Sequence, residues 1–406
     1  MNSGDISFVL VSAALVMLMV PGLAFFYGGL VRRKNVLGVL MQCFAALCVV
    51  TVQWVLFGYS LAFAPGSPFI GGLQWVGLQG VGLAPYADYS ATIPHILFVA
   101  FQMMFAVLTP AIIAGGFAER MKFSSFLVFT LAWTTFVYDP ICHWVWAVGG
   151  WVRTLGALDF AGGTVVHISS GFAALAVAML IGKRIKTKGI PPHNLPLSVL
   201  GAGILWFGWF GFNAGSALGA GSLAASAFMV THVAAAAAGA SWFIFEWIFN
   251  KKPTILGSIT GAVAGLVAIT PAAGFVSVLP ALIIGFAGSL VCFVAVTMLK
   301  PLLGYDDSLD AFGIHGIGGA AGALLTGVFA SKAVNSAGAE GLIHGNAPLI
   351  TTQLIAVGVT AAYAFIATAV IYKVIDWTMG MRVSEKHEDM GLDLSQHQES
   401  AYTVLE

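Results

Sequence analysis

Residues 162–181 read GGTVVHISSGFAALAVAMLI, and residues 311–330 read AFGIHGIGGAAGALLTGVFA. Each stretch is long enough to cross a membrane as a helix, and each carries one histidine, His167 or His315. Ionisable side chains are costly in hydrocarbon, so each histidine marks a candidate functional site, and the pair indicates a polar line through a membrane. The alternative for each histidine is a helix-packing hydrogen bond to a neighbouring carbonyl.

The composition is that of a protein with many membrane spans. Of the 406 residues, 59% are hydrophobic and 8% are charged, against roughly a quarter charged in a soluble domain. The formal net charge is zero and no basic block stands out, so nucleic acid is not an expected partner. Neither a metal nor a cofactor is expected. The cysteines lack CxxC spacing and are interpreted as small packing residues: Cys43, Cys48, Cys142 and Cys292.

Eleven apolar stretches are long enough for a tilted helix of roughly twenty residues. The first is followed by Arg32, Arg33 and Lys34 without a small-residue cleavage site, which indicates a retained helix rather than a signal peptide. The predicted fold class is therefore an all-α polytopic membrane protein. Its spans are 6–30, 36–63, 94–117, 123–143, 162–182, 195–214, 222–249, 254–272, 276–299, 311–331 and 349–380.

The distribution of basic residues predicts the orientation. With the N-terminus outside, two of the 17 Lys and Arg residues, Arg153 and Lys332, lie on the outer side, which leaves fifteen on the inner side. This positive-inside bias predicts a cell-membrane protein with a cytoplasmic C-terminus. A span added or dropped in the middle would scatter the charges over both sides. The inner positions are 32, 33, 34, 120, 122, 183, 184, 186, 188, 251, 252, 300, 373, 382 and 386.

Eleven spans divide as five, five and one. A tandem copy of a five-helix unit re-enters the membrane upside down, which gives an inverted repeat with sites at the repeat interface. Inversion would place His167 and His315 on equivalent helices that approach the midplane from opposite sides. The predicted transmembrane domain is 1–381, with a repeat at 6–182, an inverted repeat at 195–331 and a last helix at 349–380, followed by a cytoplasmic tail at 382–406.

Two aspartates immediately precede the histidine-bearing runs. Asp159 and Asp310 are interpreted as helix N-caps, whose carboxylates accept hydrogen bonds from free backbone N–H groups. A capping aspartate can still orient a cation site. A third histidine, His232, has no counterpart and is expected to be a packing or vestibule residue. The glycine-rich run 313–322 lies inside a predicted membrane helix, so close helix packing is favoured over a nucleotide-binding loop.

Several ordered motifs resemble the ammonium transporter (Amt/Mep/Rh) family. They are PGLAFFYGG at 21–29, DFAGGTVVH at 159–167, WFGFNAGS at 209–216, DAFGIHG at 310–316 and GLDLSQHQESAY at 391–402. The resemblance covers nearly the whole chain. It implies a homotrimer in which each subunit has its own pore, and Trp146 with Ser216 favours the bacterial Amt branch.

The resemblance also implies roles for individual residues. A recruitment site for the cation precedes a gate of two phenylalanines, and twin histidines line the apolar passage below. The matching residues are Trp146, Ser216 and Phe105 for recruitment, Phe105 and Phe212 for the gate, and His167 and His315 for the relay. Asp159 is added to the recruitment site because a capping aspartate can orient a cation. From composition alone, the tryptophan would be interfacial, the phenylalanines ordinary packing residues and the serine a partner of the preceding turn.

The chemistry of these side chains suits ammonium. A desolvated aromatic face attracts a cation by up to about 2 kcal/mol, but potassium has a similar size and charge. Hydrogen-bond acceptors and the loss of a proton discriminate better, because potassium can neither donate nor deprotonate. Neutral imidazoles supply acceptors, and a histidine pair that shares one proton can relay another.

The predicted function is ammonium or ammonia transport across the cytoplasmic membrane. The alternatives are a Rhesus-like neutral gas channel, a small-amide channel or an ammonium sensor. An intramembrane enzyme is disfavoured because no nucleophile or HExxH motif accompanies the Asp and His residues. The acidic tail 382–406 is predicted to be solvated or disordered, and its resemblance implies docking of a PII-type signalling protein at the inner face.

Overall fold

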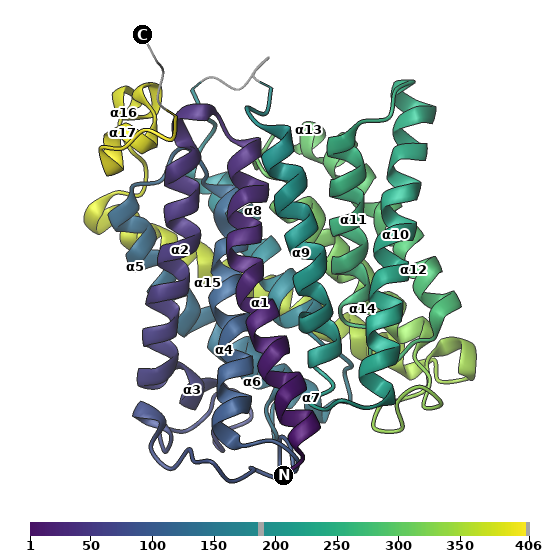
Figure 1. The fold of residues 1–406 in the computed structure, drawn as a ribbon. Helices are drawn as coiled ribbons and strands as arrows, with labels where there is room; N and C mark the ends of the chain where they lie inside the picture. Colours follow the sequence, from purple (N-terminus) through teal and green to yellow (C-terminus); the bar gives the residue numbers. More distant parts are fainter. Residues whose placement is uncertain (186–190, 403–406) are drawn as a thin grey trace.

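The computed structural model describes residues 1–185 and 191–402, and within these ranges it contains helices and isolated bridges but no strand. The all-α class is therefore confirmed. The helices stand side by side as a bundle, with the first residues of the chain at one end of it and residues 385–397 at the other (Figure 1). Of the predicted inner-side residues, Lys186 and Lys188 lie outside the described ranges.

Ten helices of the described chain are long and apolar enough to cross a membrane. The predicted span 254–272 is represented by α11, Ile255–Ile269, whose 15 residues extend about 22 Å, less than the roughly 30 Å of a bilayer core. The last helix, α15, is longer than the core and runs obliquely past the others (Figure 1). The ten are Ser3–Leu30, Arg33–Phe63, His95–Gly116, Phe123–Thr154, Gly163–Ile181, Leu195–Gly215, Ser222–Asn250, Val278–Leu303, Phe312–Phe329 and Pro348–Met379.

Several of these membrane-spanning helices contain a π-helical turn. Such turns are frequent at functional sites and, in this chain, join shorter α-helical pieces. With α11, the α-helices of the bundle are α1 (Ser3–Leu30), α2 (Val36–Gln53), α3 (Tyr59–Phe63), α4 (His95–Ile112), α5 (Phe123–Trp133), α6 (Asp139–Trp146), α7 (Trp151–Thr154), α8 (Ser169–Ile181), α9 (Leu195–Gly215), α10 (Ser222–Asn250), α12 (Val278–Val294), α13 (Lys300–Leu303), α14 (Gly318–Phe329) and α15 (Pro348–Met379). The π-turns are η2 (Trp54–Gly58), η5 (Thr134–Tyr138), η6 (Gly163–Ile168), η7 (Ala295–Leu299) and η8 (Phe312–Ile317).

Short 3-10 turns complete the described chain: η1 (Arg33–Asn35), η3 (Val76–Leu78), η4 (Ile113–Gly116) and η9 (Leu342–His344). Close packing between α1 and α9 depends on glycine. A Cβ on Gly201, Gly208 or Gly211 of α9 would overlap atoms of α1. Without a hydrophobic driving force between helices in lipid, this close approach supplies van der Waals contact.

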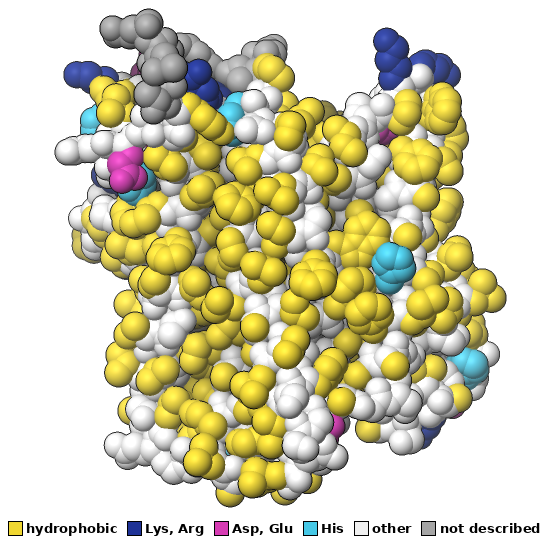
Figure 2. Space-filling model, in the orientation of Figure 1, with side chains coloured by type: hydrophobic (Ala, Val, Ile, Leu, Met, Phe, Trp, Pro, Cys, Tyr) yellow, Lys and Arg dark blue, Asp and Glu magenta, His cyan; other side chains and the backbone are white. Residues whose placement is uncertain are grey.

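Charged side chains gather at one end of the bundle, here called the basic end. On the face in Figure 2, hydrophobic side chains cover the middle, and most Lys and Arg side chains lie at the upper edge. The basic end is held by a buried network. Glu119 accepts hydrogen bonds from the Arg32 side chain at 2.9 Å, from Asn35 at 2.7 Å and from Arg184 at 2.6 Å, while Arg184 also pairs with Asp306 at 2.9 Å.

The tail is helical in the described residues, contrary to the predicted disorder, while most of its residues stay exposed or partly exposed, as expected for a solvated segment. It forms α16 (Glu385–Met390) and α17 (Leu392–His397), which lie at the basic end (Figure 1). The Asp393 carboxylate accepts from the backbone N–H of Gly38 at 2.8 Å, and the Leu392 N–H donates to the Asn35 side chain at 2.7 Å. Overall acidity misled the prediction because these few anchoring residues find partners on the helical bundle. Residues 403–406 lie outside the described ranges.

We expect Glu119→Gln to lower the free energy of unfolding by about 3 kcal/mol, because it removes the carboxylate that pairs with Arg32 and one of the two carboxylates that pair with Arg184. Thermal unfolding of the detergent-purified protein measures the loss. Glu385→Gln, an exposed residue of α16, is the matched control and should melt like the wild type. Equal melting of Glu119→Gln and wild type at neutral pH would contradict the role of the network.

The same variant carries a pH prediction. Burial alone would raise the pKa of Glu119, but Arg184 and Arg32 outweigh it and hold the pKa below its usual value. This stabilisation is therefore present above the unfolded pKa of about 4.3 and is lost as the pH falls through the lower folded pKa. The difference in melting temperature between wild type and Glu119→Gln should shrink in that acidic window. A constant difference down to pH 2 would contradict the expected linkage.

Candidate functional site

The two histidines singled out in the sequence lie against each other. His167 Nδ1 is 3.1 Å from His315 Nδ1, and the ring centroids are 5.2 Å apart. Both side chains are buried, with 0% and 5% exposure. Since one nitrogen must donate and the other accept, the hydrogen bond requires opposite protonation states at the two facing nitrogens. The pair therefore shares a single proton along this line.

Both histidines belong to π-turns that begin continuous helices. His167 lies in η6 before α8, and His315 lies in η8 before α14. These helices meet where a Cβ on Gly171 would overlap the backbone nitrogen of Gly316. The missing side chain at this crossing lets the two backbones approach closely enough for the imidazoles to meet.

Aromatic rings continue the line away from the histidines. The His167 ring stacks near Phe212 with centroids 6.0 Å apart, and Phe212 lies 4.4 Å from Phe105. Phe105 in turn meets the edge of Trp146 at 5.7 Å. The structure thus brings together the five predicted ring-bearing site residues, Trp146, Phe105, Phe212, His167 and His315, which we call the aromatic column.

One end of the aromatic column opens into a cavity of about 490 Å³, the tryptophan cavity, whose lining includes Trp146, Ser216 and Asp159. Phe105 and Phe212 are fully buried beneath it. The Ser216 hydroxyl donates to the Phe212 carbonyl at 2.8 Å, which leaves its lone pairs available. The Trp146 indole N–H donates to the Asp159 carbonyl at 3.0 Å and fixes the ring.

Asp159 acts as the predicted helix cap. Its carboxylate accepts from the backbone N–H groups of Gly162 at 2.8 Å, Gly163 at 2.7 Å and Thr164 at 2.8 Å, and also from the Thr164 hydroxyl. These groups are among the unpaired donors at the start of a helix. The carboxylate is thus largely occupied, so it acts on the tryptophan cavity through the geometry that it fixes.

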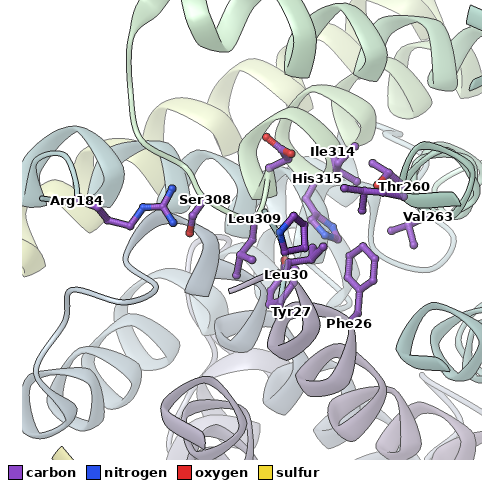
Figure 3. A pocket seen from close by; sticks show the side chains of 13 residues that line it. Phe26, Tyr27, Leu30, Arg184, Thr260, Val263, Ser308, Leu309, Ile314 and His315 are labelled. Atoms are coloured by element: carbon purple, nitrogen blue, oxygen red, sulfur yellow. The ribbon is translucent and has the colours of Figure 1, made fainter. Parts of the chain in front are cut away.

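The other end of the column opens into a second cavity of about 220 Å³, the tyrosine cavity, lined by Tyr27, Thr260, Asp310 and His315 among others. Figure 3 looks into it, with the His315 ring close to Tyr27 and Phe26. Between the cavities, beside the histidines, lies a hollow of only about 10 Å³. Apart from His167 and His315 its lining is apolar: Met19, Leu23, Phe26, Leu108, Ile112, Leu205, Trp209 and Val263. Such a space holds about one water at most.

The predicted capping role of Asp310 is wrong. Asp310 has a positive φ of 57° and pairs with Lys300 Nζ at 2.5 Å, so its carboxylate turns away from the helix start. Asp307 caps instead, accepting from the Phe312 N–H at 2.8 Å. Asp307 lies eight residues before His315, as Asp159 lies eight before His167. This equal spacing is the signal in the sequence that identifies Asp307 as the cap, in place of the predicted Asp310.

One further aromatic contact of the site, between Trp209 and His167, was not predicted from the sequence. Trp209 lies 5.4 Å from the His167 ring, between ring centroids, and donates its indole N–H to Thr270 Oγ1 at 2.8 Å, so it forms one wall beside the histidine.

His232 is exposed on α10 beside Trp206, at 5.4 Å between ring centroids, and lines neither cavity. The expected packing role agrees with this contact, whereas a vestibule role does not.

A bundle of apolar helices around a narrow buried line between two cavities defines a multi-pass membrane transport protein. The sequence profile of the Ammonium Transporter Family matches residues 7–402, and the chain belongs to that family.

Relatives and solved structures agree with this assignment. An ammonium transporter of Bacillus subtilis is 56% identical over 402 residues, which cover 99% of both chains. Ammonium transporter Amt1 of Archaeoglobus fulgidus is 50% identical and covers 99% of this chain and 100% of its own. The crystal structure of Candida albicans Mep2 has a TM-score of 0.90 at 38% identity, covering 95% of this chain and 87% of that one. The chain is thus a relative of transporters rather than of enzymes.

We expect Gly171→Ala to separate α8 from η8 and to break the hydrogen bond between the histidines, because the new methyl group meets the Gly316 backbone. Misplacement of about 1 Å in a reacting pair can cost about 10²-fold, so ammonium transport should fall by at least roughly tenfold. Currents in proteoliposomes measure this. Gly203→Ala, where a Cβ meets open space, is the matched control. Wild-type current in Gly171→Ala would show that the close crossing is dispensable.

Proposed function

We propose that this chain transports ammonium by drawing the cation into the tryptophan cavity and passing it along the aromatic column, with its proton handed to the histidine pair. The observation that supports this proposal most directly is the 3.1 Å Nδ1–Nδ1 contact of His167 and His315 in the aromatic column between the two cavities. Trp146, Ser216, Phe105 and Asp159 form the recruitment site, and Phe105 with Phe212 forms the gate. His167 and His315 form the relay.

The narrow hollow supports separation of the proton from the nitrogen. A space of about 10 Å³ with mostly apolar walls offers no substitute for the hydration shell of a cation. Neutral ammonia carries no such penalty, while the shared hydrogen bond of the imidazoles offers a separate path for the proton. Potassium has no proton to give up, so the same passage excludes it.

We further propose eleven spans, with α11 as the eighth, arranged as two inverted five-helix repeats and a last helix. The equal Asp–His spacing at the two histidine helices supports the repeat. The start of α1 and the tail helices α16 and α17 lie at opposite ends of the bundle, which supports an odd number of crossings. The basic end is cytoplasmic by the positive-inside rule, which places the tryptophan cavity and the N-terminus outside and the tyrosine cavity inside.

Residues 1–381 form the transmembrane domain in this proposal, and 382–406 form a regulatory tail. The chain assembles as a homotrimer in the cell membrane, and a PII-type protein docks at the basic end. A second candidate function, ammonium sensing, is favoured by the similarity to a structure titled "Sensor Amt Protein", with a TM-score of 0.89 and 28% identity over 97% of this chain. Flux through the purified chain separates the two functions.

Replacing either His167 or His315 by alanine should lower ammonium current by about 10²-fold, because the proton loses its relay. Replacing either by aspartate puts a carboxylate in the same dry passage, where it can hold a whole cation by charge, so potassium current should appear. Solid-supported membrane recordings with ammonium and potassium measure both effects, and gel filtration checks assembly. Alanine variants that assemble normally and carry wild-type ammonium current without potassium leakage would refute the relay.

Trp146→Leu should raise the half-saturating ammonium concentration roughly tenfold and loosen selectivity, because an aliphatic side chain has no negative face. Phe212→Ala should change the maximal current more than the half-saturating concentration, since the side chain lies below the cavity. Concentration series of the transport current distinguish these outcomes. A wild-type concentration dependence for Trp146→Leu would remove the tryptophan from the recruitment site.

Truncation after Met381 should both reduce transport and abolish binding of a PII-type protein, because it removes the helices docked on Asn35 and Gly38. Transport assays and pull-down with a purified PII-type protein test this. Asp393→Ala, which removes one anchor and keeps the chain, should show a smaller change in the same direction. Unchanged flux and unchanged binding in the truncated protein would remove the tail from regulation.

A further inference from the structure

Gln102 occupies a position between the tryptophan cavity and the gate. It lies on α4, four residues after Phe98 and three before Phe105, so the three side chains share one helix face. Gln102 and Phe98 both line the tryptophan cavity, while Phe105 is buried beneath it. The rise per residue places the glutamine about 4.5 Å from the gate along the helix axis.

The amide of Gln102 is buried without a matching partner. The side chain is 9% exposed, and within residues 1–185 and 191–402 its Oε1 atom has no hydrogen-bond partner. Gln353 shows what a structural glutamine does in the same protein: its amide accepts from the Leu158 N–H at 2.8 Å and donates to the Leu158 carbonyl at 2.9 Å. A buried acceptor without such partners calls for a partner that the protein does not supply, such as an ion or a water molecule.

The acceptors of Asp159 and Trp146, two residues that line the same cavity, are already engaged. The Asp159 carboxylate is occupied by backbone N–H groups, and its carbonyl accepts from Trp146. Arg153 occupies the carbonyl of Trp146 at 2.5 Å. The Ser216 hydroxyl and the Gln102 amide oxygen keep open acceptor sites, and each ammonium ion brings four N–H donors.

We propose that Gln102 is an ammonium-binding residue, whose amide oxygen accepts an N–H of the cation as it passes from the tryptophan cavity to Phe105. This inference rests on the proposed function and deepens it, because a ring face attracts charge whereas the amide oxygen gives directional hydrogen bonding. The amide also has a donor end that suits an anion. The carboxylates of Asp88 and Asp159 and the ring of Trp146 line the same cavity and outnumber its one cationic residue, Arg153, so the cavity favours a cation.

The test is the concentration dependence of ammonium current in proteoliposomes of the full chain. Gln102→Leu should raise the half-saturating ammonium concentration roughly tenfold, equivalent to about 1.4 kcal/mol, with maximal current within about twofold of wild type. Gln102→Glu keeps the acceptor and should match wild type or saturate at lower concentration. Gln79→Leu, the same change at an exposed outer-loop position, should leave both quantities unchanged.

Measuring Trp146→Leu in parallel shows whether a negative result overturns only the role of Gln102 or the recruitment site as well. If Trp146→Leu shifts the half-saturating concentration and Gln102→Leu does not, Gln102 is not a binding residue and the recruitment site stands. If neither shifts, the proposed recruitment site also fails. A lower maximal current in Gln102→Leu at unchanged half-saturating concentration shows a structural role and overturns the inference. If Gln102→Leu fails to assemble, Gln102→Met, whose new side chain is unbranched, is measured instead and judged by the same criteria.

Discussion

The hydrogen bond between His167 and His315 is the constraint on which the rest of the structure depends. Two imidazoles buried in a membrane protein must satisfy each other, because hydrocarbon offers them no water. Their contact requires two helices to start inside the bundle and to cross without side chains at Gly171 and Gly316. A pair held in this way has one facing nitrogen protonated and one free, which is the condition for passing a proton on.

Starting a helix inside the bundle leaves backbone N–H groups unpaired, and two aspartates satisfy them. Asp159 and Asp307 each accept from the first turn of the helix that carries a histidine. The same capping fixes the Asp159 carbonyl that holds the indole of Trp146. One set of local hydrogen bonds around Asp159 therefore fixes the position of both the His167 helix and the Trp146 wall of the tryptophan cavity. A substitution that breaks the cap is expected to displace both.

The sequence predicts the helical class and most spans because apolar runs of about twenty residues are recognisable without tertiary information. It also identifies the ring-bearing residues of the aromatic column, through motifs that resemble a known family. It fails at Asp310, where a positive φ and the Lys300 ion pair redirect the carboxylate. It also fails at the tail, whose order depends on Asn35 and Gly38 far away in the chain, and it gives no sign of the unpartnered amide of Gln102.

In the proposed account, nitrogen and proton part at the histidine pair and cross the narrow hollow separately. The direct measurement is the current of the wild-type protein in liposomes under equal inward gradients of ammonium and of potassium, each repeated in heavy water. The account predicts a current with ammonium that slows in heavy water, and no current with potassium. A potassium current comparable to the ammonium current, unaffected by heavy water, would contradict it, because an intact cation would then be crossing the passage.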